Sequence, residues 1–273
     1  MREIAFQKWE ATGNDFLFVD SDSQTITAED VEPREIARAC DRSQGFGADG
    51  VVFFGSGADS VVAMTVVNSD GSRGDMCGNA LRCLAKILHQ KTGANTHAVS
   101  LAGRLVEVKA GAGDAEVMMG PVSDIPGTEK FGDLAALSGV TGRKGHLVSF
   151  GNPHYVTPVK SIPSDWVELG RALQEPAQGA LGTGGINAGF VAREADPEGV
   201  RELRVFERGA GPTKSCGSGA CAASAVLEEL CGISPPHALR LTGGVLTIGR
   251  EGQSFTLRGP ANLEFRDIWR IEN

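Results

Sequence analysis

The fold of this chain is decided by two short stretches, MCGNALRCLAKIL at residues 76–88 and SCGSGACAASAVL at residues 215–227. Each places a cysteine and a glycine directly before a run of apolar and small residues. In the first run, leucine and alanine recur at helical spacing. The second run is apolar or small on all sides, which is typical of a buried helix. Both stretches therefore predict a helix that begins just after a cysteine, over residues 79–90 and 218–230.

The similarity between these stretches is part of an internal repeat. The two cysteines lie 139 positions apart (216 − 77 = 139). Three further matches, one before the cysteines and two after them, occur in the same order in both halves at offsets of 138 to 140. They are GNDF (13–16) with GNPH (151–154), HAVSLAGRLV (97–106) with HALRLTGGVL (237–246), and GP (120–121) with GP (259–260). Four ordered matches at nearly one offset are hard to obtain by chance, so the chain is predicted to contain two homologous halves.

The repeat defines the domain organisation. We expect one half at residues 1–130 and the other at residues 131–273. Valine-rich segments bounded by Gly or Asx, such as residues 104–109 and 245–248, predict short strands in both halves. The sequence therefore predicts an α+β fold of two pseudo-symmetric domains, each with strands around one central helix.

Composition and charge narrow the classes of function. The net charge is −8, whereas nucleic acid or an anionic membrane calls for a cationic surface. No segment approaches the roughly 18 consecutive apolar residues of a membrane span, and the N-terminus shows no secretory core. We expect a cytoplasmic protein with reduced thiols and with neither nucleic-acid nor membrane partners. The six cysteines lack the paired spacing of a zinc site, so no metal is expected.

Cys77 and Cys216 are the candidates for catalysis because the repeat places one cysteine at a helix start in each half. A helix N-terminus presents unpaired N–H groups and a partial positive charge, which bind a carboxylate and lower the pKa of a nearby thiol. Gly78-Asn79 and Gly217-Ser218 let an anion approach the backbone closely. Because an isolated cysteine is most often a small core residue, we expect the other four to lie in the core.

Two equivalent thiols suit one reaction in particular. Inversion of a carbon centre by proton transfer needs a base on one face and an acid on the other, and the two exchange roles in the reverse direction. A thiolate and a thiol meet this requirement because both forms are accessible near neutral pH. The enolate-like charge that develops on an amino-acid carboxylate would be stabilised by helix N–H groups. The pattern therefore favours an amino-acid epimerase or racemase.

A second pair of positions follows the same repeat. Asn68 and Glu207 each lie nine residues before their cysteine (77 − 68 = 9; 216 − 207 = 9), and Arg208 follows Glu207. An Arg can bind a carboxylate bidentately, and a Glu can hold an ammonium group or polarise a thiol. The alternative for Glu207 and Arg208 is a solvated surface pair.

Two Gly-Asn motifs supply further candidates. Asn14 and Asn152 occupy equivalent positions in the repeat, and His154 follows the second of them. Ligand binding and turn formation are evenly balanced for both asparagines, because Asn favours turns and tolerates positive φ. His154 is either part of a site or a structural histidine with satisfied ring nitrogens.

Together these motifs resemble those of the diaminopimelate epimerase family. The two cysteine motifs combined with Gly-Asn-Pro-His and Glu-Arg-Gly are highly specific, and the matches span nearly the whole chain in the family's order. They are GNDF (13–16), GADG (47–50), NSDGS (68–72), MCGN (76–79), GNPH (151–154), Asn187, ERG (207–209) and SCGSGA (215–220). Departures are local: Ser218 replaces a more usual Thr, and Pro212 interrupts a usual Gly-Glu-Thr.

The resemblance implies a fold and an activity. Each domain would be a mostly antiparallel β-barrel around a central helix, and the last strand, about residues 263–273, could pack on the first half. The activity would be epimerisation of LL-2,6-diaminopimelate to meso-diaminopimelate, in lysine and peptidoglycan precursor synthesis. The resemblance also implies that the enzyme works without pyridoxal phosphate or another cofactor, and that it is a homodimer.

The resemblance further implies a role for each candidate residue. Cys77 and Cys216 would be the paired acid and base, supported by Glu207 and His154. Backbone amides would hold the carboxylate at the reacting centre, namely those of Gly78, Asn79, Gly217 and Ser218. The distal end of the substrate would be held by Asn68, Asn152, Asn187 and Arg208, with Asn14 nearby.

The distal contacts bear on the choice of substrate. A short amino acid would leave Arg208 and three asparagines unpaired, which would reject it strongly. One alternative is a cofactor-independent racemase of another amino acid, such as histidine, on the same fold. A thiol hydrolase built on Cys77 and His154 gives no reason for a second equivalent cysteine. A non-catalytic binding module would bind a ligand without exchanging its α-hydrogen.

Overall fold

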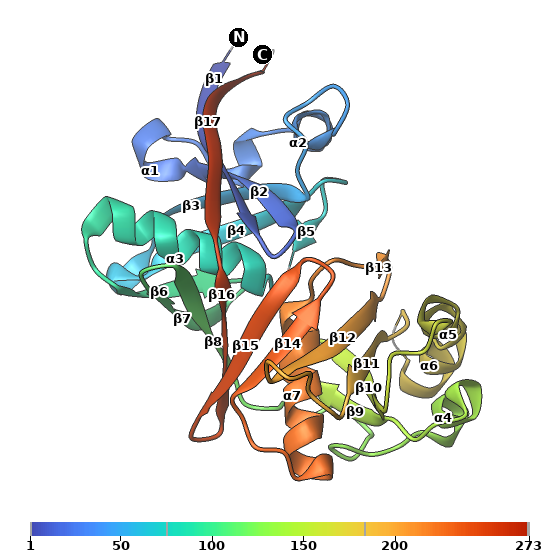
Figure 1. Ribbon diagram of the computed structural model, residues 1–273. Helices are drawn as coiled ribbons and strands as arrows, with labels where there is room; N and C mark the ends of the chain where they lie inside the picture. Colours follow the sequence, from blue (N-terminus) through green and yellow to red (C-terminus); the bar gives the residue numbers. More distant parts are fainter. Residues whose placement is uncertain (1, 75, 183, 272–273) are drawn as a thin grey trace. The chain divides into compact units, whose positions relative to one another are not determined.

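The computed structural model describes residues 2–74, 76–182 and 184–271 (Figure 1). The chain forms two compact units, one of Met1–Val117 with Gly259–Asn273 and one of Met118–Arg258. Helices and strands are mixed in both units, so the predicted α+β class is confirmed. The sequence predicted halves at residues 1–130 and 131–273, whereas the two units divide between Val117 and Met118 and again between Arg258 and Gly259.

The first unit is a mixed sheet with one long helix. Its strands are β1 (Arg2–Ala11), β2 (Asn14–Asp20), β3 (Gly50–Ser56), β4 (Val62–Asn68), β5 (Arg73–Gly74), β6 (Thr96–Leu101), β7 (Arg104–Ala110), most of β8 (Asp114–Gly120), and β17 (Asn262–Ile271). They pair in the order β17-β1-β2-β3-β4-β6-β7-β8, in which β2–β3 and β4–β6 are parallel and the other pairs antiparallel. The helices are α1 (Ser21–Gln24), η1 (Ala28–Asp30), α2 (Pro33–Cys40), η2 (Ala58–Ser60) and α3 (Gly78–Thr92).

Helix α3 is the central helix of the first unit. It contacts β1, β2, β6 and β7, and its first eight residues are all buried. Cys77 is the N-cap, and the helix ends at Gly93, whose φ of 77° lies in the left-handed region that favours glycine. The helix predicted over residues 79–90 is therefore confirmed.

The second unit repeats this plan. Its strands are β9 (His146–Ser149), β10 (Pro153–Val159), β11 (Asn187–Ala192), β12 (Val200–Glu207), β13 (Gly211–Pro212), β14 (His237–Leu241), β15 (Gly244–Glu251) and most of β16 (Ser254–Pro260). They pair in the order β9-β10-β11-β12-β14-β15-β16, in which β10–β11 and β12–β14 are parallel and the other pairs antiparallel. The helices are α4 (Ala135–Thr141), α5 (Trp166–Ala172), α6 (Gln174–Leu181) and α7 (Gly217–Cys231).

The internal repeat is therefore confirmed as a repeated topology. In each unit, a parallel pair is followed by an antiparallel pair and then by a second parallel pair, whose crossover contains the long helix. Helix α7 contacts β9, β10, β11, β12 and β15, and Cys216 is its N-cap. Helices α5 and α6 lie in the β10–β11 crossover, as α1 and α2 lie in the β2–β3 crossover, and with α4 they cover a core that includes Leu137, Tyr155 and Phe190.

Candidate functional site

The first candidate site is the start of α3. Cys77 is partly exposed and has an extended backbone (φ −134°), and its Sγ accepts a hydrogen bond from the backbone N–H of Ala80 at 3.5 Å. The carbonyl of Cys77 accepts from Leu81 N at 3.0 Å, which starts the helical ladder. Gly78 and Asn79 are buried behind the thiol. The thiol therefore sits where α3 presents its first backbone N–H groups.

A chain of side-chain amides leads away from this helix start. Asn79 Nδ2 donates to Asn14 Oδ1 at 2.5 Å, and Asn14 Nδ2 donates to Asp49 Oδ2 at 2.8 Å. The structure thus brings together two predicted residues, Asn14 and Asn79. Asn68 is partly buried at the end of β4, where its Nδ2 donates to Ser72 Oγ at 2.9 Å.

The second candidate site is the start of α7. Cys216 is only 5% exposed, and its Sγ accepts from the backbone N–H of Gly219 at 3.4 Å. Its Sγ also lies 3.6 Å from Ser218 Oγ. Burial, followed by the charge of Glu207, raises the pKa of Cys216 well above its usual value, although both hydrogen bonds lower it. The sequence predicted only the lowering effect of a helix start, because burial and the neighbouring carboxylate follow from the tertiary structure.

Glu207 lies beside Cys216 at the end of β12. Its carboxylate accepts a hydrogen bond from Thr213 Oγ1 at 2.5 Å and is also hydrogen-bonded to the Cys216 thiol. Burial raises the pKa of Glu207 in spite of both bonds. The surface-pair alternative does not hold for Glu207. Thr213 was missed in the sequence, although it follows the Pro212 that interrupts the usual motif.

His154 is fully buried on β10. Its Nε2 lies 3.1 Å from Asn152 Oδ1 and 3.1 Å from Ser218 Oγ, so it joins two predicted residues. Because an amide oxygen only accepts, we assign the ring proton to Nε2. Burial and then the charge of Arg208 lower the pKa of His154 to about 3, which makes it a neutral donor at physiological pH. Its Nδ1 has no hydrogen-bond partner among the described residues.

Asn187 and Arg208 are linked through the backbone. Asn187 is buried, its Nδ2 donates to the carbonyl of Pro153 at 3.0 Å, and its Oδ1 accepts from the backbone N–H of Arg208 at 3.0 Å. The side chain of Arg208 is exposed. Asn187 therefore fixes the point at which the chain leaves β12, and the Arg208 guanidinium projects from that point.

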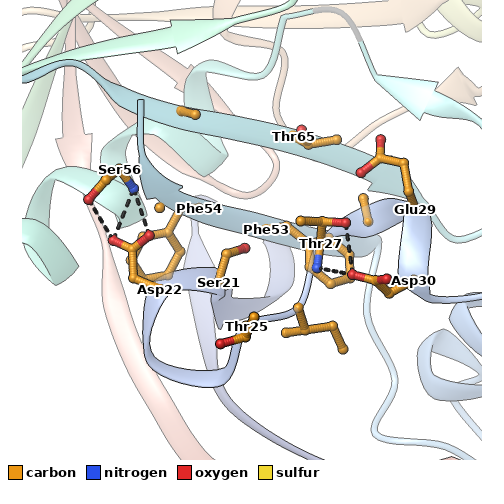
Figure 2. A pocket seen from close by; sticks show the side chains of 14 residues that line it. Ser21, Asp22, Thr25, Thr27, Glu29, Asp30, Phe53, Phe54, Ser56 and Thr65 are labelled. Atoms are coloured by element: carbon orange, nitrogen blue, oxygen red, sulfur yellow. Dashed lines mark hydrogen bonds between the residues drawn. The ribbon is translucent and has the colours of Figure 1, made fainter. Parts of the chain in front are cut away.

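The hollow shown in Figure 2 is a different feature of the first unit. It has a volume of about 650 Å³ and lies between the α1–η1 segment and strands β3 and β4. Two of its acidic groups already have partners, because Asp22 accepts from Ser56 at the end of β3 and Asp30 accepts from Thr27. None of the residues predicted for the site lines this hollow.

Neither a metal site nor a membrane-spanning helix is found among the described residues. In the described ranges, no group of three or more His, Cys, Asp or Glu side chains is arranged to hold a metal ion. None of the described helices is both long and apolar enough to span a bilayer.

Solved structures share the fold. A hydroxyproline epimerase from Agrobacterium vitis, solved with trans-4-hydroxy-L-proline, aligns with a TM-score of 0.68 at 15% identity over 100% of this chain and 94% of that one. A phenazine biosynthesis protein of the PhzF family from Bacillus anthracis aligns with a TM-score of 0.71 at 13% identity over 99% and 100% of the two chains. This shared fold defines the structural class of the chain.

Sequence comparison then gives the family within that class. The protein-family model described as diaminopimelate epimerase matches residues 6–125 and 146–263 of this chain. The diaminopimelate epimerase of Prochlorococcus marinus (strain MIT 9313) is 35% identical over 97% of this chain and 92% of its own length. That of Synechococcus elongatus is 36% identical over 94% and 95%. The chain belongs to the diaminopimelate epimerase family and is an isomerase, as predicted.

Proposed function

We propose that this enzyme epimerises LL-2,6-diaminopimelate to meso-diaminopimelate by two-base proton transfer between Cys77 and Cys216, without a cofactor. This step supplies lysine and peptidoglycan precursors. The observation that carries the proposal is the equivalence of the two cysteines, each of which caps the long helix of its unit. Inversion at one α-carbon requires two groups that can exchange the roles of acid and base, and a pair of matched thiols provides them.

The environment of Cys216 supports a protonated thiol at rest. Its raised pKa favours the S–H form, and Glu207 accepts a hydrogen bond from that thiol. Cys216 would then donate its proton to the carbanion formed when Cys77 acts as base, and the roles reverse in the opposite direction. His154 contributes as a neutral donor that holds Asn152 and Ser218, since it does not carry charge near neutral pH.

The substrate carboxylate at the reacting centre would be held by backbone amides. Gly78 and Asn79 follow Cys77, and Gly217 and Ser218 follow Cys216. These residues form the first turns of α3 and α7, where N–H groups have no carbonyl partner within the helix. As charge moves onto the carboxylate in the transition state, these N–H groups stabilise it more strongly.

The other end of the substrate would be recognised by polar side chains. Arg208 is exposed and is suited to a bidentate bond with the distal carboxylate. Asn68, Asn152 and Asn187 would bind the distal ammonium and carboxylate. Asn14, which the resemblance put near that end, is bonded to Asn79 at the start of α3 and so would lie close to the reacting end. Asn187 uses one amide hydrogen on Pro153, which leaves its second N–H for the substrate.

We extend the proposal to a cytoplasmic homodimer. A reducing compartment keeps both catalytic thiols free. Strand β17 pairs with β1, and Phe265 and Ile268 on β17 are 38% and 41% exposed. An edge strand with apolar side chains is suited to pairing with a second copy. Light scattering across a dilution series of the wild type and Ile268→Asp tests this, and a monomer at high concentration would contradict it.

The substrate is tested with a panel of amino acids. Reduced enzyme without added cofactor is incubated in D₂O with LL-diaminopimelate, meso-diaminopimelate, histidine and proline, and the α-hydrogen is followed by NMR. We expect interconversion and deuterium incorporation with both diaminopimelate isomers and not with the other two. Exchange with histidine alone would make the enzyme a racemase of another amino acid, and binding without exchange would make it a binding module.

A further inference from the structure

The motif Gly47-Ala48-Asp49-Gly50 has no role in the mechanism proposed above. Asp49 lies directly before β3, at the end of the loop that follows α2. The loop is held by backbone bonds from Phe46 N to Ala39 O (2.8 Å) and from Ala48 N to Cys40 O (3.0 Å). The position of Asp49 is therefore set by the backbone and not by its side chain alone.

Both carboxylate oxygens of Asp49 are engaged. Oδ2 accepts from Asn14 Nδ2 at 2.8 Å and from the backbone N–H of Asp15 at 3.2 Å. Oδ1 accepts from Arg42 Nη2 at 2.7 Å. Asp49 thus connects a guanidinium on one side with the amide of Asn14 on the other.

This carboxylate determines which way the neighbouring amides point. An ionised carboxylate only accepts hydrogen bonds, so the NH₂ of Asn14 must face Asp49. The Asn14 oxygen must then face away, where it accepts from Asn79 Nδ2 at 2.5 Å. The Asn79 oxygen faces Thr12 Oγ1 at 3.5 Å. One charged group therefore sets the direction of two amides in a row, and at the far end Arg82 Nη2 donates to Thr12 Oγ1 at 2.9 Å.

Arg42 anchors the carboxylate. Its guanidinium also binds both oxygens of Asp15, at 3.0 and 2.7 Å, and Asp15 pairs with Lys8 at 2.9 Å. Burial alone would raise the pKa of Asp15, but the hydrogen bonds from Arg42 and Lys8 outweigh it and hold that pKa below its usual value. Asp15 and Arg42 therefore remain charged, and Arg42 keeps a fixed position for Asp49.

In the second unit, the hydrogen bonds that correspond to those of the Asp49 backbone are made by a side chain. Asp49 uses its backbone to accept from Ser69 N (3.0 Å) and to donate to Asp15 O (2.8 Å). In the second unit the side-chain amide of Asn187 makes the equivalent two bonds, to Arg208 N and to Pro153 O. Because the backbone of Asp49 makes these two bonds, its carboxylate is available for a different contact, which it makes with Asn14.

We propose that Asp49, anchored by Arg42, is the positioning residue of the site at the start of α3. Asp49 fixes the side-chain amides of Asn14 and Asn79 for binding of the substrate carboxylate. The inference rests on the proposed function, because that function places the substrate carboxylate at the backbone amide of Asn79, beside the side-chain amides that Asp49 orients. Asp49 acts only through Asn14. Asn79 is the second residue of α3 and lies two positions after Cys77, so its orientation bears directly on the reacting end.

The test uses Asp49→Asn, Asp49→Glu and the matched control Asp41→Asn. Asp41 lies in the same loop and is exposed, where it accepts from Ser43 and Gln44. Asp49→Asn presents an NH₂ to either Asn14 or Arg42, so we expect KM for diaminopimelate to rise about tenfold with a smaller change in kcat. Asp49→Glu keeps the charge but displaces it, so it should raise KM similarly. It replaces Asp49→Asn as the test variant if Asp49→Asn fails to fold. Asp41→Asn should retain the wild-type KM.

A double-mutant cycle separates positioning from general damage. In the Asn14→Ala background, Asp49→Asn should raise KM by less than about twofold, because its route of action is gone. A full tenfold rise in that background, or a normal KM in both Asp49 variants of an active enzyme, would overturn the inference. A wild type inactive on diaminopimelate would instead contradict the proposed function.

One further readout is independent of the substrate. The side-chain NH₂ resonances of Asn14 and Asn79 are assigned by NMR of ¹⁵N-labelled protein, using single asparagine variants. Asp49→Asn should shift both pairs, including those of Asn79, which Asp49 does not bond directly. Asp41→Asn should shift neither. An unmoved Asn79 signal in Asp49→Asn would overturn the inference whatever the activity.

Discussion

The starts of α3 and α7 occupy the same place in a repeated topology, yet their surroundings differ. Cys216 is buried, and a carboxylate and a neutral histidine are linked to its helix start. Cys77 is partly exposed, and the side-chain amides of Asn79 and Asn14 connect its helix start to Asp49. At the positions nine residues upstream, the second unit has Glu207 and the first has Asn68. Duplication thus preserved the cysteine-capped helix while the groups that control each thiol diverged.

The difference has a chemical meaning. An epimerase must start each direction with one thiol protonated and the other ready to accept a proton. Two identical environments would give the two thiols equal pKa values. A buried carboxylate next to a thiol biases the proton toward that thiol, and Glu207 is so placed beside Cys216.

The largest expected effect is loss of either capping cysteine. Cys77→Ala and Cys216→Ala should each lower the epimerisation rate by at least about 10³-fold, because the remaining thiol cannot serve the opposite face of the α-carbon. The rate is measured by chiral chromatography of the products. Cys231→Ala, at the end of α7, is the matched control and should retain wild-type activity. If one capping variant kept its activity, the two helix starts would not be equivalent partners in the reaction.

The next effect comes from exchanging the upstream groups. Glu207→Gln removes a charge that raises the pKa of Cys216, so the pKa should fall while kcat falls about 100-fold. The pH dependence of alkylation by iodoacetamide, read at Cys216 by mass spectrometry, reports the pKa. Asn68→Asp places a carboxylate at the matching position in the first unit and should leave the Cys216 profile unchanged. An unaltered Cys216 profile in Glu207→Gln would remove the proposed basis of the asymmetry.

The buried histidine gives a prediction about pH and stability. His154 corresponds to Phe16 in the first half (154 − 16 = 138), so only the second helix start contains this titrating group. Its folded pKa of about 3 lies below the unfolded value of about 6.5, so the unfolded chain binds more protons between these values. The resulting stability is fully present above about pH 6.5 and is lost as the pH falls toward 3.

His154→Gln should therefore weaken the dependence of stability on pH on the acid side. Urea unfolding is measured in steps from pH 7 to pH 5 for the wild type and the variant. His237, which is also buried with a lowered pKa, is present in both proteins and cancels in the comparison. Equal slopes for the two proteins would mean that His154 is protonated in the native state.

The smallest effect comes from making the second helix start resemble the first. Gly219 corresponds to Ala80 (219 − 80 = 139), and a Cβ at Gly219 would lie 3.1 Å from Val205 Cγ2 and 3.2 Å from Cys216 Sγ. Gly219→Ala gains up to about 1 kcal/mol in helix propensity but crowds the thiol. We expect a Tm close to that of the wild type and a kcat lowered about threefold. A large drop in Tm would show that the added methyl group destabilises the folded unit and does not merely displace the thiol.

Much of this organisation was accessible from the sequence because it is carried by local patterns. The cysteine-glycine motifs and the apolar runs after them located both long helices, and the repeat gave the duplicated topology. Three features were not accessible: the carboxylate of Asp49 reaching Asn14, the amide of Asn187 replacing a backbone peptide, and the burial that raises the pKa of Cys216. Each depends on groups that are distant in sequence and meet only in the folded unit.

The central claim is that two thiols, and not one, move the proton. It is tested most directly by converting unlabelled LL-diaminopimelate in D₂O and stopping the reaction at low conversion. With two bases, the abstracted proton stays on one thiol while the other delivers a solvent-derived deuteron. The meso product should therefore carry deuterium at the inverted carbon, and unreacted LL substrate should carry none. Product that retains the original hydrogen would show that one base returns the same proton, and it would contradict the account.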